Sequence, residues 1–194
     1  YTKNIADCDV KIYSLCVKLT ELRKSAADKF CKNIENELKT LNIANAKFNV
    51  RFKEYDKASA NLQSANGSDV ICFELKPLNK VISGGEMSRF MLAIKTQLKN
   101  LNGISTYIFD EIDAGISGFT AGTVAAKFRD ISKATQILAV SHLPQVCAAS
   151  DAQLLIYKVE EGGKTITKVK RLTESQKIDE IMRLTGSVNS DAAR

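Results

Sequence analysis

The sequence contains no apolar run of about 18 residues, the length that a helix needs to cross a bilayer, so we expect no membrane span. It also lacks the basic residues followed by an apolar segment with which a signal peptide begins. Because its first residue is Tyr1 and not Met, we expect a fragment of a longer chain. Apolar residues make up 44% and charged residues 26%, which excludes a disordered chain. The 194 residues suffice for one compact domain with some appended structure.

The sequence also lacks the paired cysteines of metal sites and dense tracts of basic residues. The five cysteines are odd in number and contain no C-x-x-C pair, which argues against a disulfide framework and against a zinc site. A reducing cytoplasm is therefore the expected compartment. The net charge of +6 is scattered along the chain, so charge alone favours a solvated surface over a DNA-binding groove.

The phosphate-binding loop G-x-x-x-x-G-K-[ST] is absent from these residues. The segment 162–165, G-G-K-T, resembles its end, but Lys158 stands where the first glycine belongs. The flanking segments, 154–159 and 165–169, have the composition of strands, which predicts a β-hairpin rather than a strand leading into a helix. We therefore interpret G-G-K-T as part of a turn.

Coiled-coil spacing dominates the first part of the chain. Between Asp9 and Leu41 there is no Pro or Gly, and apolar residues recur in alternating steps of three and four until the register shifts at Phe30. The pattern predicts a long helix, either the root of a two-helix arm that enters a globular head or an amphipathic helix packed on a domain. The spacing leaves both open. The apolar positions are Ile12, Leu15, Leu19, Leu22, Ala26, Phe30, Ile34, Leu38 and Leu41.

The rest of the sequence predicts strands and helices of an α/β fold. Two short apolar runs, 106–109 and 136–140, flank a helical stretch at 119–132. Such a unit predicts parallel strands that are buried on both faces. The other expected elements are strands at 46–52 and 70–75 and helices at 84–101 and 177–184.

A serine and two glycines stand immediately before the helix expected at 84–101. Ser83 can cap this helix with Glu86 as its capping-box partner, while Gly84 and Gly85 allow the turn. The same backbone offers unpaired N–H groups and the positive end of the helix dipole to a phosphate. The two interpretations are compatible, because a capped helix start can also face a nucleotide.

Polar residues also follow each of the two short apolar runs. Asp110 and Glu111 follow the first; in phosphoryl-transfer sites one such carboxylate helps to hold magnesium, and a second orients or deprotonates the attacking water. Alone, this pattern is more typical of an ordinary polar strand end. His142, the only histidine, follows the second run, where a lone histidine is more often structural than catalytic.

The order and spacing of these motifs resemble those of the RecN family of SMC-like, ABC-type ATPases. The matching strings are residues 82–89 (I-S-G-G-E-M-S-R), 108–118 (I-F-D-E-I-D-A-G-I-S-G) and 140–146 (V-S-H-L-P-Q-V). They are similar to the signature motif, the Walker B motif with its D-loop, and the switch histidine of that family. The resemblance extends from the end of the predicted coiled coil to about Gly186.

The resemblance implies catalytic roles for three of the matching residues. Asp110 would hold Mg²⁺ through its water shell, Glu111 would be the general base, and His142 would sense the γ-phosphate of ATP.

The other matching residues are implied to work between two heads. Residues Ser83, Gly84, Gly85 and Glu86 would contact ATP bound to the opposite head of a dimer. Asp113 and Ser117 would lie in the D-loop along the dimer seam. Many relatives have Asp where Ser117 stands, so a side-chain contact is not implied there.

The resemblance further implies a fold, partners and a function. Residues 43–194 would form the C-terminal lobe of an ABC/SMC-type ATPase head of the P-loop NTPase superfamily, and residues 1–42 the root of its coiled-coil arm. The partners would be an N-terminal lobe of the same protein that carries Walker A, a second copy of the head in a homodimer, and DNA. Hydrolysis of ATP would drive DNA clamping in double-strand break repair and recombination, in the bacterial cytoplasm at the nucleoid.

Two alternatives remain at this level. The chain could be a structural or interaction lobe without ATPase activity of its own, or part of the head of another SMC-like ATPase. In either case we expect the 194 residues alone to be inactive, because they lack Walker A.

Overall fold

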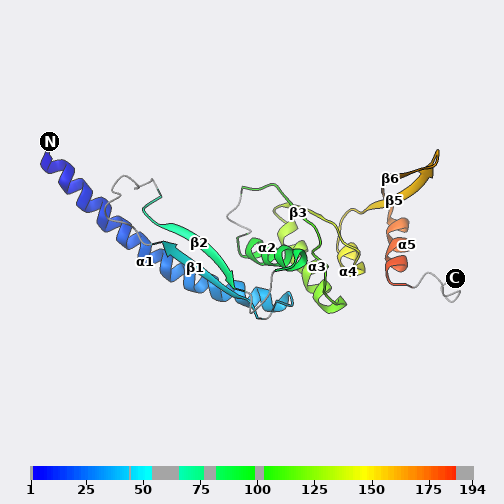
Figure 1. Cartoon of the computed structure of the whole chain (residues 1–194), viewed down its shortest axis with the longest axis horizontal. Coiled ribbons are helices and arrows are strands. Elements are labelled where there is room, and N and C mark those ends of the chain that lie inside the picture. The colour runs from blue at the N-terminus through cyan, green and yellow to red at the C-terminus, as the bar shows by residue number, and fades with distance from the viewer. Residues whose placement is uncertain (1, 44, 54–65, 77–81, 99–102, 187–194) are drawn as a thin grey trace. The chain divides into compact units, whose positions relative to one another are not determined.

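The computed structural model describes residues 2–43, 45–53, 66–76, 82–98 and 103–186 (Figure 1). By its contacts the chain divides into two compact units. One comprises Tyr1–Lys39 and Ile43–Val81, and the other comprises Thr40–Asn42 and Ile82–Arg194. The functional boundary between an arm root at 1–42 and a head lobe at 43–194 stays a prediction.

The first unit contains the helix α1, Thr2–Thr40, which confirms the predicted long helix and extends it toward the N-terminus. The N-terminal part of its apolar stripe is exposed: Ile12 is 40%, Leu15 66% and Leu22 62% exposed. A helix packed along its length on a domain would bury such residues, so their exposure favours the interpretation as part of an arm. None of the described helices is both long and apolar enough to span a bilayer.

Two antiparallel strands accompany α1, as predicted. β1 (Lys47–Lys53) pairs with β2 (Val70–Lys76), with Phe48 opposite Leu75. The rings of Phe48 and Phe73 lie 5.8 and 5.9 Å from that of Phe30 of α1, within the range of favourable aromatic contact. These contacts attach the strand pair to the helix.

A polar contact adds to this attachment. Asp69, just before β2, accepts hydrogen bonds from Thr20 Oγ1 at 2.6 Å and Arg23 Nη1 at 2.7 Å. Burial raises the pKa of the Asp69 carboxyl, but these hydrogen bonds and the charge of Arg23 outweigh burial, and the net shift is downward.

The second unit contains the predicted strand–helix–strand arrangement. Its elements are α2 (Gly84–Leu98), β3 (Thr106–Phe109), α3 (Gly118–Ser132) and β4 (Gln136–Ala139). β3 pairs with β4 in parallel, with Tyr107 beside Ile137. The rings of Phe109 and Phe128 of α3 lie 5.1 Å apart, so α3 covers one face of the pair. The predicted helix stop at Asn102 lies outside the described residues.

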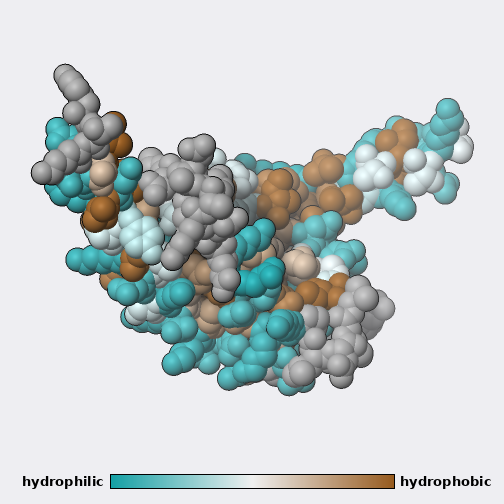
Figure 2. Space-filling model, turned by 60° about the vertical axis from the view of Figure 1, so that its left-hand side comes forward, coloured by the Kyte–Doolittle hydropathy of each residue, from teal (hydrophilic) through white to brown (hydrophobic). Residues whose placement is uncertain are grey.

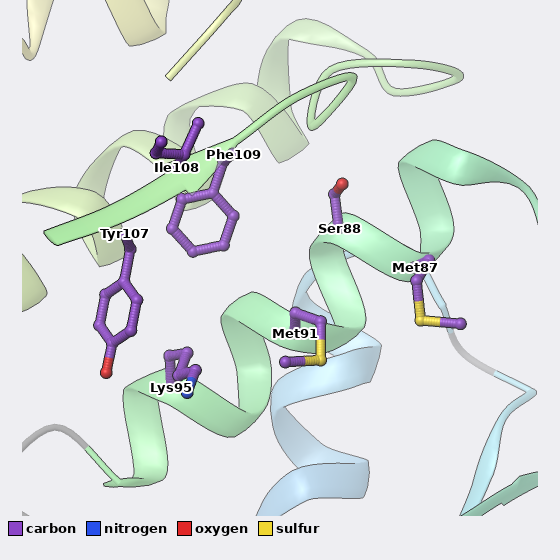
Figure 3. Close-up of a pocket in the computed structure, with 7 residues that line it drawn as sticks. All are labelled: Met87, Ser88, Met91, Lys95, Tyr107, Ile108 and Phe109. Carbon is purple, nitrogen blue, oxygen red and sulfur yellow. The ribbon is translucent and has the colours of Figure 1, made fainter. Parts of the chain in front are cut away.

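The prediction that these strands are buried on both faces is wrong for this chain. Figure 3 shows Tyr107 and Phe109 pointing from β3 toward α2, while Ile108 lies on the other side of the strand. Ile108 is 73% exposed, and Leu138 and Val140 are exposed with it, because no described element covers that face. Figure 2 shows how hydrophobic side chains stand on the surface among hydrophilic ones.

The last part of the unit consists of α4 (Pro144–Ala148), β5 (Leu154–Glu161), β6 (Lys164–Arg171) and α5 (Glu174–Leu184). β5 and β6 form the predicted hairpin. Its turn residues Gly162 and Gly163 have φ values of 61° and 74°, which favour glycine, and Lys164 and Thr165 begin β6, so the G-G-K-T string spans a hairpin turn and is not a phosphate-binding loop.

Two helix starts in this region were missed from the sequence. Pro144 at the first turn of α4 and the capping box of Thr173 with Gln176 in α5 are ordinary start signals. α5 therefore begins three residues before the expected Lys177, at Glu174.

Candidate functional site

The start of α2 is capped as the sequence predicted. The Glu86 backbone N–H donates to Ser83 Oγ at 3.2 Å, and the Ser83 backbone N–H donates to Glu86 Oε2 at 3.0 Å. Ser83 Oγ also donates to Glu86 Oε2 at 3.2 Å. Ser83 is exposed, and among the described residues none accepts a hydrogen bond from the N–H of Gly84 or Gly85. Gly84 is exposed whereas Gly85 is buried, so the Gly84 N–H is the donor accessible at the positive end of the helix.

The two glycines are needed because the start of α2 lies very close to the loop after β3, and not only because the chain turns there. A Cβ on Gly85 would lie 2.8 Å from the Cβ of Ala114 and 2.9 Å from the carbonyl oxygen of Glu111. A Cβ on Gly84 would meet the Glu111 carboxylate. The glycines thus bring the start of α2 against the loop that follows β3.

That loop turns immediately after β3. Glu111 has a φ of 54°, which is uncommon for a residue with a side chain, and its backbone N–H donates to Asp110 Oδ1 at 2.9 Å. The N–H of Ala114 donates to the Glu111 carbonyl at 3.0 Å and closes the turn. Asp110 and Glu111 are both exposed, so their carboxylates are accessible to a ligand.

Two residues of α2 that were not singled out from the sequence fasten the helix to this loop. Ser88 Oγ donates to the Asp110 carbonyl at 2.6 Å, and Arg89 Nη1 donates to the carbonyls of Ala114 at 2.7 Å and Ile112 at 3.3 Å. Arg89 is 3% exposed. Burial lowers the pKa of its guanidinium, and the nearby Glu86 carboxylate opposes this shift. Burying a charged guanidinium costs free energy, which the hydrogen bonds to the backbone carbonyls offset. These hydrogen bonds hold the loop in one place.

Asp113 and His142 are brought together at the end of β4. One carboxylate oxygen of Asp113, Oδ2, accepts from Ser141 Oγ at 2.6 Å and from the His142 backbone N–H at 2.7 Å. His142 Nδ1 lies 3.0 Å from the same oxygen. Asp113 is buried, whereas the His142 side chain is 75% exposed. The imidazole is thus anchored at one nitrogen and accessible elsewhere.

Ser117 is not joined to either group. It precedes α3 as an exposed N-cap residue whose side chain makes no capping hydrogen bond. The sequence-predicted residues therefore fall into three places: the α2 start with Asp110 and Glu111, the Asp113–His142 pair, and Ser117.

A small cavity lies near these residues. It lies between α2 and β3, has a volume of about 220 Å³, and is lined mainly by apolar side chains such as Met87, Met91 and Phe109 (Figure 3). Pockets that enclose a small ligand typically measure about 300–1,000 Å³. Within the described part of the chain, no three His, Cys, Asp or Glu side chains lie close enough together to hold a metal ion directly.

The two glycines are expected to respond differently to substitution. Gly85→Ala meets backbone atoms of the loop and should destabilise the fold by about 1–3 kcal/mol, whereas Gly84→Ala meets only the movable end of Glu111 and should stay within about 0.5 kcal/mol of wild type. Urea denaturation of both variants checks this difference. Equal losses would contradict the assigned close approach.

No family model matches the sequence. The chain is 41% identical over 178 residues to the DNA repair protein RecN of Halalkalibacterium halodurans, which covers 88% of this chain and 31% of that protein. It is 36% identical over 189 residues to the DNA repair protein RecN of Bacillus subtilis, covering 88% and 33%. The chain therefore spans about a third of the length of these relatives.

The fold is similar to that of a solved Smc head domain. The crystal structure of the Smc head domain with a coiled coil and joint derived from Pyrococcus yayanosii matches with a TM-score of 0.53 at 20% sequence identity, covering 84% of this chain and 30% of that one. This likeness confirms the predicted fold class, a lobe of an SMC/ABC-type head.

Proposed function

Because this chain is a relative of the RecN DNA repair proteins and has the fold of a lobe of an SMC-type ATPase head, we propose that the whole protein is an ATPase that acts on DNA in double-strand break repair. The observation that carries the proposal is the packing of the Ser83–Gly85 helix start against the loop that bears Asp110 and Glu111. This contact places a helix start that can bind a phosphate beside two accessible carboxylates.

The proposed catalytic residues follow from accessibility and chemistry. Asp110 would hold Mg²⁺ through water. When bound, the ion would neutralise charge that develops on the phosphates. Glu111 would take a proton from the attacking water, and His142 would contact the γ-phosphate.

The residues at the α2 start are proposed to contact ATP held by the opposite head. Gly84 offers its exposed N–H group, Ser83 is exposed beside it, and Gly85 lets the helix start lie against the loop that bears Glu111. Asp113 and Ser117 are proposed to lie along the seam between heads. Because Asp113 is hydrogen-bonded within its own lobe, its backbone rather than its carboxylate would face the seam.

The open face of the β3–β4 pair is proposed to be covered by an N-terminal lobe of the same protein. Ile108, Leu138 and Val140 are 73%, 45% and 55% exposed there. Parallel strands normally have both faces covered, and this chain spans about a third of the length of its relatives. The missing cover would carry the Walker A loop that these residues lack.

The proposed mechanism is a clamp. ATP held between two heads would join the Walker A side of one head to the Ser83 helix of the other. Hydrolysis would remove the γ-phosphate that bridges the two heads, so the heads would separate. Binding and hydrolysis of ATP would thereby close and open the clamp around DNA. A protein with this role would work at the bacterial nucleoid, in the cytoplasm.

The test compares the intact protein with the 194-residue chain. We expect DNA-stimulated ATP hydrolysis by the intact protein, and neither hydrolysis nor micromolar ATP binding by the 194 residues, because the cradle for the β- and γ-phosphates lies elsewhere. Steady-state hydrolysis and calorimetry measure both. No hydrolysis by the intact protein would favour a structural lobe, and micromolar binding by the shorter chain would contradict a composite site.

A further inference from the structure

We infer that Asp113 is a positioning residue for His142: it fixes the orientation of the imidazole and the nitrogen that carries its proton, and it ties both to α2. The inference deepens the proposed function, since it rests on His142 as the group that meets the nucleotide.

The hydrogen bonds of Asp113 define the tautomer of His142. An ionised carboxylate only accepts hydrogen bonds, so the 3.0 Å contact between His142 Nδ1 and Asp113 Oδ2 requires a proton on Nδ1. In the neutral ring the proton is then absent from Nε2. Because the nitrogen that is protonated is set by the hydrogen bond of the ring, Nε2 is the nitrogen left for the nucleotide or its attacking water.

The same oxygen also holds the backbone on which His142 stands. It accepts from the His142 N–H at 2.7 Å and from Ser141 Oγ at 2.6 Å, and Ser141 Oγ in turn accepts from the Leu143 N–H at 3.1 Å. Rotation of the ring and displacement of the strand end are therefore opposed by one buried carboxylate.

Asp113 is itself fixed from α2. The two carbonyls that accept from Arg89 Nη1 belong to Ile112 and Ala114, the residues on either side of Asp113. The buried guanidinium thus holds the backbone of Asp113 in place. A continuous set of contacts runs from the helix that begins at Ser83, through Arg89 and Asp113, to His142.

If Asp113 only stabilised the fold, its loss would not change the tautomer of His142. Ala in place of Asp113 removes the oxygen that accepts the Nδ1 proton, so the exposed ring is no longer held in one tautomer and can carry its proton on Nε2. We expect Asp113→Ala to fold, to shift the tautomer of His142 toward Nε2, and to lower the kcat for ATP hydrolysis roughly 10- to 100-fold with a smaller change in KM.

The experiment uses the intact protein with ¹⁵N-labelled histidine in alkaline buffer. The resonances of His142 are those that disappear in His142→Gln. Wild type should show a protonated Nδ1 and an unprotonated Nε2, and Asp113→Ala should show a population protonated at Nε2. Asp151→Ala, at an exposed carboxylate in the same unit, is the matched control and should leave both tautomer and kcat unchanged.

Each outcome decides the inference. A wild-type ring with its proton on Nε2 overturns it, and so does an Asp113→Ala variant with wild-type tautomer and kcat. If Asp113→Ala does not fold, Ser141→Ala still tests it, because that variant keeps the Asp113–His142 contact and should keep the Nδ1 proton; loss of that proton would contradict the inference. If the intact wild type hydrolyses no ATP, the proposed function fails, while the tautomer still tests Asp113 separately.

Discussion

Glu111→Gln is expected to slow ATP hydrolysis by the intact protein by about 10²–10⁴-fold, the contribution typical of a general base. The amide has nearly the same size and still forms hydrogen bonds, but it cannot accept the proton of the attacking water. The backbone contacts of residue 111, from its N–H to Asp110 and from Ala114 to its carbonyl, do not involve the side chain. The variant should therefore fold and bind ATP normally.

Heads that bind ATP without hydrolysing it should also stay joined longer. Steady-state hydrolysis measures the first effect, and the lifetime of a crosslinkable dimer in ATP measures the second. Glu160→Gln, at an exposed position of β5, is the matched control. Unchanged hydrolysis together with unchanged dimer lifetime would reduce Glu111 to an ordinary carboxylate at a strand end.

A negative charge at position 83 is expected to abolish ATP-dependent joining of heads, because it would face the γ-phosphate of the opposite site. The contacts between Ser83 and Glu86 determine which variants can test this expectation. From the sequence alone Asp is as good a cap as Ser, but Glu86 Oε2 lies 3.2 Å from Ser83 Oγ and 3.0 Å from the Ser83 nitrogen. A second carboxylate there would repel Glu86 and weaken the cap as well.

Two double variants separate the charge from the cap. Ser83→Asp with Glu86→Gln keeps a side-chain oxygen at the cap and a neutral partner, and Ser83→Asn with Glu86→Gln is the same pair without the charge. Both should unfold at similar urea concentrations. Only the Asn pair should form dimers in ATP, as measured by size-exclusion chromatography with light scattering. Dimerisation of the Asp pair at the wild-type level would leave Ser83 as a cap and nothing more.

The local features of this chain were predictable because they are encoded by neighbouring residues. The long helix α1 follows from the spacing of its leucines and isoleucines, and the parallel pair β3–β4 from two short apolar runs around a helix. The glycines at 162 and 163 predicted a turn and not a phosphate loop. The capping box of Ser83 and Glu86 was equally readable, since cap and partner lie three residues apart.

By itself, then, the sequence determined the α/β elements, the order of the motifs and the family they resemble. Only the tertiary structure decided how those motifs meet. Ser88 and Asp110 are 22 residues apart, and Asp113 and Ser141 are 28 apart, so no local periodicity links them. Their pairing depends on how α2 and the β3–β4 strands pack. Packing likewise buried Arg89, which composition alone would have placed at the surface.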